Sequence, residues 1–472
     1  MTTVAKRGIR GNPQATAAST PDGQAPKLQV FTDRHLDKIE PLKRLGEEAL
    51  FEMKVVASVL PFRVNNYVIE NLIDWDRAPD DPIFSLTFPQ RDMLDPEMYE
   101  EMAELHRRDA PKEEITALAW KLRHKLNPHP AGQMEMNLPE VNGETVEGVQ
   151  HKYRETALFF PSQGQTCHSY CTFCFRWAQF VGDKDLKIAS KEAGQLLDYL
   201  AERPNLTDLL MTGGDPMVMK TKHLTPYLEG LLDERLEHVQ TVRIGTKALS
   251  FWPYRFVTDA DADELLGLFE RLVESGKHVA VMAHINHDQE MANPIFREAV
   301  RRIRATGAEI RTQSPLIKHI NDSGEVWARM WREQVRLGMI PYYMFVERDT
   351  GAKYRFEVPL AEAHRVYRDA MKQVSGLART ARGPSMSAGP GKVEIQGVAE
   401  IQGEKVFVLR FVQGRNPDWV QRPFFAKYDE QATWLNELTP AFGEETFFFE
   451  EEYAAMQEGG GLNVIDAAEA EA

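Results

Sequence analysis

Apolar and polar residues alternate with two different periods along the chain. From about residue 35 to residue 126, apolar residues recur at spacings of three and four with charged residues between them, which predicts helices. From residue 156 onward, short apolar runs suited to buried strands alternate with amphipathic helical stretches. The pattern therefore predicts an N-terminal helical region followed by an α/β region.

Six apolar runs in the second region have the length of buried strands: 156–160, 208–212, 241–246, 278–284, 309–313 and 340–346. Amphipathic stretches follow them at 191–202, 223–236, 261–275, 293–306, 323–338 and 360–374. Such alternation gives parallel strands with right-handed crossovers, and an active site at the carboxyl ends of the strands. Six units are too few for a complete eight-stranded barrel, so we expect an open or partial βα barrel, with a doubly wound sheet as the alternative.

Composition divides the chain further. Residues 1–26 lack periodicity and are predicted to be disordered, and 27–150 form the helical region with its linker. Residues 151–380 hold the six strand–helix units. Residues 381–455 alternate and turn like short antiparallel strands and are expected to form a C-terminal α/β covering segment, followed by an acidic tail at 456–472.

The chain is acidic. Its 472 residues carry 56 bases and 71 acids, a formal charge of −15, without a basic stripe, which argues against a nucleic acid partner. The last 30 residues hold nine acids and no base, so we interpret them as a solvating end, with a binding arm as the alternative. With no run of 18 apolar residues and no apolar N-terminal stretch, we expect a cytoplasmic protein that does not enter membranes.

Only three cysteines occur, Cys167, Cys171 and Cys174, and they lie within eight residues. An odd, clustered set is no disulfide framework and points to metal binding. Three thiolates on one tight loop can each bind one iron of a [4Fe–4S] cluster, which leaves the fourth iron open for a ligand. The alternative is a zinc site with His168 as fourth ligand, although structural zinc usually takes two paired knuckles and no second one follows.

The cysteine spacing, with Phe173 before the third cysteine, resembles that of the radical S-adenosylmethionine (SAM) superfamily. The longer string CTFCFRWAQFVGD, with TGGDP, RIGTKAL, INHDQE, IND and a late GPGK, resembles the lysine 2,3-aminomutase family over roughly residues 80–400. The resemblance implies a partial barrel, three cofactors (a [4Fe–4S] cluster, SAM and pyridoxal phosphate, PLP) and conversion of an α-amino acid to a β-amino acid through a 5′-deoxyadenosyl radical. A related SAM and PLP enzyme that catalyses elimination or bond cleavage, and a non-catalytic iron–sulfur protein, are the alternatives.

Residues Thr212, Gly213, Gly214 and Asp215 end the second expected strand. Glycines let a backbone approach a ligand closely and a carboxylate accepts from an ammonium group, although a plain turn has the same composition. The resemblance implies that this segment contacts SAM. Four further residues near strand ends, and the aromatic residue of the cysteine loop, are implied as SAM contacts: Arg243, His284, Asn286, Gln313 and Phe173.

Lys392 follows a glycine-rich segment, from which a lysine can approach an aldehyde and form a Schiff base; a solvated loop lysine is the alternative. The resemblance implies that Lys392 carries PLP. Lys152 and Tyr153 match the family's phosphate-binding stretch, where an arginine usually stands in place of Lys152. Another family arginine would fall at Thr156, for which Arg154 is the candidate substitute.

Three residues concern the substrate. By resemblance, Arg176 pairs with the substrate carboxylate, a task that suits a guanidinium, and Asp322 is one of two aspartates that hold the distal ammonium of lysine. The second would fall at Ser385, which is neutral, so we expect an α-amino acid other than lysine. The resemblance also implies an electron donor such as flavodoxin or ferredoxin, and a homo-oligomer.

Overall fold

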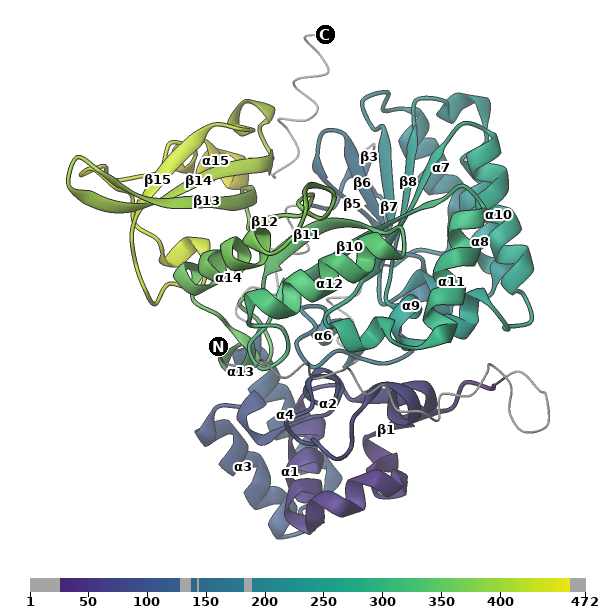
Figure 1. The fold of residues 1–472 in the computed structure, drawn as a ribbon, viewed down its shortest axis with the longest axis vertical. Helices are drawn as coiled ribbons and strands as arrows, with labels where there is room; N and C mark the ends of the chain where they lie inside the picture. Colours follow the sequence, from purple (N-terminus) through teal and green to yellow (C-terminus); the bar gives the residue numbers. More distant parts are fainter. Residues whose placement is uncertain (1–25, 128–136, 142–143, 182–188, 459–472) are drawn as a thin grey trace, which may run out of the picture.

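The computed structural model describes residues 26–127, 137–141, 144–181 and 189–458 (Figure 1). The expected disordered start and the acidic tail lie almost entirely outside these residues, as does part of the expected linker before residue 150.

One sheet organises the described part of the chain, in the order β15-β14-β13-β12-β11-β10-β9-β8-β7-β6-β5. Its middle strands are parallel: β6 (Thr156–Phe159), β7 (Asp208–Met211), β8 (Thr241–Thr246), β9 (His278–His284), β10 (Glu309–Leu316), β11 (Ile340–Val346) and β12 (Arg382–Ser387). The six expected strands are confirmed. Sequence analysis missed β12, because its sequence RGPSMS has no apolar run.

Antiparallel strands extend both edges of the sheet. At one edge β5 (Val149–Tyr153) pairs with β6. At the other, β13 (Gly391–Ile401), β14 (Glu404–Gly414) and β15 (Pro423–Lys427) continue from β12. The C-terminal segment therefore has the expected antiparallel strands, but they belong to the main sheet.

The order of the parallel strands follows the sequence without reversal. A doubly wound sheet requires such a reversal, so that alternative is wrong. Right-handed crossovers then place the connecting helices on one face, and Figure 1 shows them following one another along one side of the sheet. They are α7 (Ala193–Ala201), α8 (Thr221–Gly230), α10 (Ala262–Glu274), α11 (Pro294–Ala305), α12 (Gly324–Arg336) and α14 (Leu360–Lys372).

The two faces of the sheet differ in chemistry because successive side chains of a strand alternate. Leu209, Val242 and Val281 belong to the core that the helices cover. Asp208 and Arg243, their sequence neighbours, are only half-buried and belong to the opposite face. Polar side chains can therefore lie on the face of the sheet that the helices do not cover.

The N-terminal region is helical, as expected, with α1 (Gly46–Val59), α2 (Pro82–Thr87), α3 (Pro96–Arg107) and α4 (Lys112–Leu126). A short two-stranded antiparallel sheet in this region, β1 (Val30–Thr32) with β2 (Arg63–Asn65), was not predicted from the sequence. Its core includes Phe173, Trp252 and Phe356, which lie beyond the ends of β6, β8 and β11. The region therefore packs against the carboxyl end of the sheet, below the strands in Figure 1.

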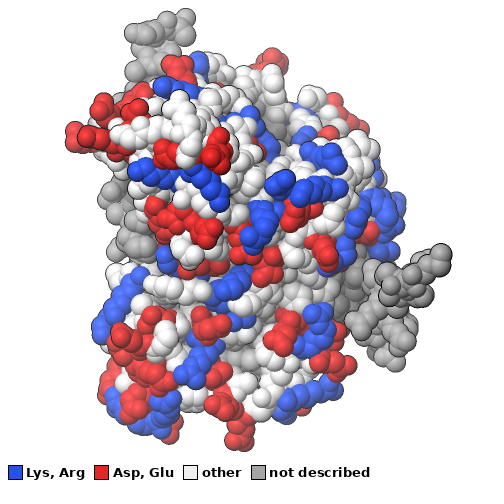
Figure 2. All heavy atoms as spheres, turned by 60° about the vertical axis from the view of Figure 1, so that its left-hand side comes forward, with Lys and Arg blue, Asp and Glu red and all other residues white. Residues whose placement is uncertain are grey.

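The remaining helices and strands are short: β3 (Glu140–Val141), β4 (Glu144–Thr145), α6 (Trp177–Phe180), α9 (Ala248–Phe251), α13 (Lys353–Phe356) and α15 (Glu450–Glu458). None of the helices in the described ranges is both long enough and apolar enough to cross a membrane. Acidic and basic side chains are intermingled over the face shown in Figure 2.

Candidate active site

The cysteine loop follows β6 and is fastened to the N-terminal region. The amides of Tyr170 and Thr172 donate to the carbonyl oxygens of Arg63 and Leu86, at 2.8 and 3.0 Å. The side-chain amide of Asn65, which is fully buried, donates to the carbonyl oxygens of His168 (3.3 Å) and Phe251 (2.8 Å). The helical region thus holds the loop in place, a role that its sequence did not indicate.

All three cysteines are free and half-buried. Burial raises the pKa of the Cys167 thiol, and the nearby carboxylate of Asp215 raises it further. Within the described ranges, no three side chains among His, Cys, Asp and Glu are arranged around a single metal ion. A cluster in which each thiolate binds its own iron does not require such convergence. The residues present therefore suit a [4Fe–4S] cluster.

His168, the fourth ligand of the zinc alternative, is 4% exposed. Burial lowers its pKa to about 3, and its Nδ1 has no hydrogen-bond partner among the described residues.

Asp215, at the end of β7, is 1% exposed and accepts three hydrogen bonds. Oδ1 accepts from the amide of Met217 (2.9 Å) and from Oγ1 of Thr246 (2.7 Å), and Oδ2 accepts from the amide of Lys247 (2.8 Å). Burial raises the pKa of Asp215 to about 6, although these hydrogen bonds lower it. The carboxylate ties the end of β7 to the end of β8.

The two glycines of this segment accommodate the chain that leads into Cys167. Gly213 has a φ of +147°, which favours glycine, and a Cβ at Gly214 would lie 2.5 Å from the amide nitrogen of Thr166. The amide of Asp215 donates to the carbonyl oxygen of Gly164 (2.9 Å). The close approach that glycine permits is therefore made by the protein itself, and the contact of this segment with SAM stays a prediction.

Phe173, His284 and Gln313 are brought together. The rings of Phe173 and His284 meet edge to face with centroids 5.8 Å apart, and His284 pairs with Gln313 across β9 and β10. Nε2 of His284 is buried without a hydrogen-bond partner in the described part of the chain. These residues form a contact zone beside the cysteine loop.

Asn286, by contrast, is completely buried and hydrogen-bonded. Its Oδ1 accepts from Nζ of Lys247 (2.8 Å), and its Nδ2 donates to Oγ of Ser314 (2.8 Å). Lys247 also forms a buried ion pair with Glu290 at 2.8 Å. Sequence analysis did not single out this pair, although RIGTKAL and INHDQE contain its two members.

Arg243 is the third residue of β8 and lies within the strand, not at its end as expected. Its guanidinium pairs with the carboxylate of Asp208 on β7, with Nη2 and Oδ2 2.5 Å apart. Its charge acts on Lys392, so the structure places Arg243 towards the lysine end of the site.

Lys392 is the second residue of β13, opposite Ser387 of β12, and so lies on a strand rather than in a loop. Its Nζ donates to Oε1 of Gln413 (3.0 Å) and lies 4.3 Å from the ring centroid of Tyr343. Burial lowers the pKa of Lys392 to about 7, helped by the charges of Arg243 and Arg382. At neutral pH a large fraction of the amine is uncharged, which is the form that attacks an aldehyde.

Lys152, on β5, reaches the turn before Lys392, where its Nζ donates to the carbonyl oxygen of Ala388. Arg415 donates from Nε to the carbonyl oxygen of Gly389 in the same turn (2.9 Å). Burial lowers the pKa of Lys152, and the charges of Arg415, Arg348 and Lys392 lower it further. These four cations therefore lie near one another, an arrangement suited to anionic groups such as phosphate and carboxylate.

Tyr153 also contacts this group: its ring lies 5.4 Å from Nζ of Lys152. Arg154 does not, because its Nη2 donates to Oδ1 of Asn205 (3.4 Å), before the amino end of β7. Arg348 and Arg415 are the cations that sequence analysis missed; both lie outside the quoted sequence strings.

Arg176 and Arg348 flank the ring of Phe175, with guanidinium carbons 5.0 and 5.2 Å from its centroid. Arg176 also lies 4.6 Å from the centroid of Phe160. Among the described residues, neither guanidinium has a carboxylate within ion-pair distance, and both arginines are half-buried. Phe175 directly follows Cys174, so this pair links the cysteine loop to the cations around Lys152.

Asp322 and Ser385 lie in different surroundings. Asp322 is exposed, and its Oδ2 accepts from the amide of His319 at 2.9 Å. Ser385 is fully buried on β12, beside Phe345 of β11, and its Oγ has no partner among the described residues.

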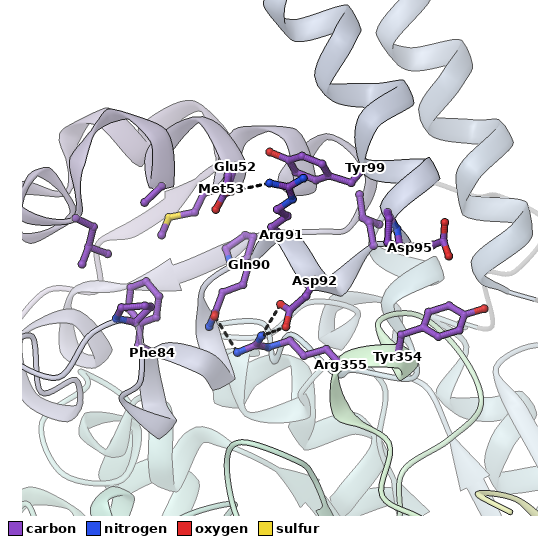
Figure 3. A pocket seen from close by; sticks show the side chains of 16 residues that line it. Glu52, Met53, Phe84, Gln90, Arg91, Asp92, Asp95, Tyr99, Tyr354 and Arg355 are labelled. Carbon is purple, nitrogen blue, oxygen red and sulfur yellow. Dashed lines mark hydrogen bonds and ion pairs between the residues drawn. The ribbon is translucent and has the colours of Figure 1, made fainter. Parts of the chain in front are cut away.

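A cavity of about 690 Å³ lies elsewhere, between the N-terminal helices and α13 (Figure 3). Four of the charged groups in its wall pair with one another: Arg355 with Asp92, and Arg91 with Glu52 at 3.6 Å. The cysteines and Lys392 are not part of its lining.

Comparisons with known proteins find relatives in sequence. A protein of Aquifex aeolicus, provisionally named L-lysine 2,3-aminomutase, is 29% identical over 412 residues, which cover 87% of this chain and 96% of that protein. The L-lysine 2,3-aminomutases of Haemophilus influenzae and Escherichia coli are 30% and 29% identical over 241 residues, about half of this chain and 66% and 65% of theirs. No family model matches the chain. Among solved structures, Streptococcus suis SuiB bound to S-adenosylmethionine is similar with a TM-score of 0.34 at 13% identity, covering 58% of this chain and 57% of SuiB.

Proposed function

Since this chain belongs to the lysine 2,3-aminomutase family of radical SAM enzymes, we propose that it is a PLP-dependent amino acid 2,3-aminomutase. The amino group of an α-amino acid would move from C2 to C3 while a hydrogen moves from C3 to C2. Because substrate and product are isomers, the reaction consumes no oxidant or reductant overall. When bound, the cluster and SAM would supply the radical that starts the reaction, and PLP the carbonyl that holds the nitrogen.

The observation that carries the proposal is Lys392, an amine with a pKa of about 7 beside a group of cations. Lys392 would bind PLP covalently, and Lys152 and Arg415 would hold its phosphate group. Arg176 would bind the substrate carboxylate. The zone of Phe173, His284 and Gln313 would receive SAM next to the cysteine loop.

Four further features belong to the same proposal: a partial barrel, a cytoplasmic location, a homo-oligomeric state and an electron donor. The contact of Lys152 with Ala388 brings β5 close to the turn between β12 and β13, which supports a sheet curved into a partial barrel. We place the enzyme in the cytoplasm as a homo-oligomer, with flavodoxin or ferredoxin as electron donor, as the family resemblance implies.

Reduction with borohydride tests the role of Lys392. After incubation of the protein with PLP, reduction and peptide mapping should find the pyridoxyl group on the peptide that contains Lys392, and Lys392→Ala should abolish the label. A label on Lys247 or Lys318 would contradict the assignment.

Anaerobic incubation with SAM, dithionite and amino acids then tests the reaction. Mass spectrometry should find a product of unchanged mass with its amino group on C3. A product that has lost ammonia would instead indicate an elimination.

A further inference from the structure

The two arginines around Phe175 form an unusual pair for this site. Two guanidiniums against one ring repel each other, and both are half-buried with no carboxylate within ion-pair distance among the described residues, although the charge of Asp349, the next residue in the chain, also acts on Arg348. Charges in such positions are costly unless an anion compensates them. One anion, the α-carboxylate of the substrate, accounts for Arg176 alone.

The carboxylates on the neighbouring strands are already engaged. Asp208 pairs with Arg243, and Glu394 with Arg410 at 2.8 Å. Asp322, the residue expected to hold a distal ammonium, is exposed and bonded to its own loop. Asp208 and Glu394 are therefore neutralised by arginines, and Asp322 is the one of these three carboxylates that has no ion-pair partner among the described residues, in an exposed position.

Glu347, next to Arg348, needs separate consideration. It is 7% exposed, and neither of its carboxylate oxygens has a partner among the described residues. The charges that act on it come from Glu357 and Lys353, in and just after α13, whereas Arg348 faces Phe175. Burial raises the pKa of Glu347, and Glu347 is not among the groups whose charges act on Arg176 or Arg348.

Ser385, the other residue expected near a distal ammonium, is neutral. Ser385 stands opposite Phe345 in the pairing of β12 with β11, its buried hydroxyl has no partner among the described residues, and the ring of Phe345 lies 5.7 Å from Nζ of Lys392. A neutral hydroxyl group can donate to a carboxylate oxygen, but it cannot neutralise an ammonium group.

We propose, on the basis of the function above, that the substrate is an α-amino acid with a second carboxylate on its side chain, and that Arg348 determines this specificity by pairing with that carboxylate. Arg176 then binds the α-carboxylate, and Phe175 between them sets the separation of the two anions. The positive charge around Lys392 thus serves three anionic groups, namely the cofactor phosphate and both carboxylates of the substrate.

Calorimetric titration of the protein loaded with cluster, SAM and PLP, without reductant, tests the proposal in the absence of turnover. L-Glutamate and L-glutamine have the same shape and differ in charge, with L-aspartate and L-lysine as further ligands. Glutamate or aspartate should bind at least about tenfold more tightly than glutamine or lysine. Equal affinity for glutamate and glutamine, or a preference for lysine, would overturn the proposal.

Arg348→Gln should weaken the binding of the acidic ligand by about a hundredfold while it leaves the PLP and iron content unchanged. Arg348→Asp should shift the preference towards lysine. Arg336→Gln is the matched control, because this exposed arginine pairs with Glu333 on the surface of α12. Loss of PLP from Arg348→Gln would mean that Arg348 holds the phosphate, and would also overturn the proposal.

A failure of the proposed specificity can be distinguished from a failure of the proposed function. If Lys392 carries the pyridoxyl label but acidic amino acids bind no better than neutral ones, only the specificity is wrong. If the label and the cluster are both missing, the proposed function fails.

Discussion

The two ends of the site differ in how their charged groups are paired. At the cysteine end, Asp215, Asn286 and the Lys247–Glu290 pair are buried and satisfied by the protein itself. At the lysine end, Arg176 and Arg348 have no carboxylate partner among the described residues, and burial with neighbouring cations lowers the pKa values of Lys152 and Lys392.

The difference has a physical meaning. Satisfied buried groups rigidify a segment, because every alternative arrangement leaves a donor or acceptor unpaired. Unpaired cations store an unfavourable energy that a bound anion relieves. We therefore interpret the cysteine end as a preformed scaffold and the lysine end as a site completed by its anionic ligands.

Assembly of the iron–sulfur cluster is the property that should distinguish the two ends of the site most clearly. Cys171→Ala should abolish the iron and sulfide of the reconstituted protein, because a [4Fe–4S] cluster needs all three thiolates of this loop. Lys392→Ala should retain both. Analysis of the iron and sulfide content of the two variants tests this prediction. One zinc ion per chain and no sulfide in the wild-type protein would contradict the assignment of a [4Fe–4S] cluster.

The pH dependence of PLP attachment probes the lysine end. The pKa of Lys392 is lowered to about 7, so its amine is mostly neutral above pH 7 and becomes protonated as the pH falls through 7. The rate of pyridoxyl labelling should therefore fall by about a hundredfold between pH 8 and pH 5. The peptide that carries Lys372, an exposed lysine on α14, serves as the unlabelled control. A tenfold fall per pH unit over the whole range, about a thousandfold in total, would mean that Lys392 titrates like an ordinary lysine.

Asn65 tests whether the cysteine end is a scaffold that the N-terminal region supports. Asn65→Ala leaves the carbonyl oxygens of His168 and Phe251 without their donor, which should lower the free energy of unfolding by about 3 kcal/mol. Asn66→Ala is the neighbouring control, since its side chain bonds only exposed backbone groups, and should cost under about 1 kcal/mol. Denaturant titration of both apoproteins measures the difference. Equal effects would show that the loop does not depend on Asn65.

Gly214 provides the smallest expected effect. Its alanine variant places a Cβ 2.5 Å from the backbone of Thr166, which should cost about 2 kcal/mol because backbone must move. Gly194→Ala, on α7, meets nothing within 4 Å and should be neutral or stabilise the helix by up to about 1 kcal/mol. The thermal unfolding temperatures of the two variants measure the difference. An unchanged unfolding temperature of Gly214→Ala would show that the backbone of the cysteine loop can shift at little cost.

Much of the fold was predictable because its signal is local. The apolar runs at 208–212 and 241–246 predict β7 and β8 almost residue for residue, and each amphipathic stretch became a helix. β12 was not predicted, because its strand conformation comes from pairing with β11 and β13 and not from apolar residues. The same limit applies to Lys392, whose sequence context indicated a loop although it lies on β13.

The sequence by itself determined the chemistry available and the local elements: three thiols on one loop, a lysine after a glycine-rich segment, and the alternation of strands and helices. Only the tertiary structure decided which charges are paired. Arg243 pairs with Asp208 within the sheet, and Asp322 is exposed. Arg348 and Arg176 both contact the ring of Phe175. The physical reason is distance: spacing along the chain decides local conformation, whereas ion pairing and desolvation depend on side chains that the fold brings within a few ångströms of each other.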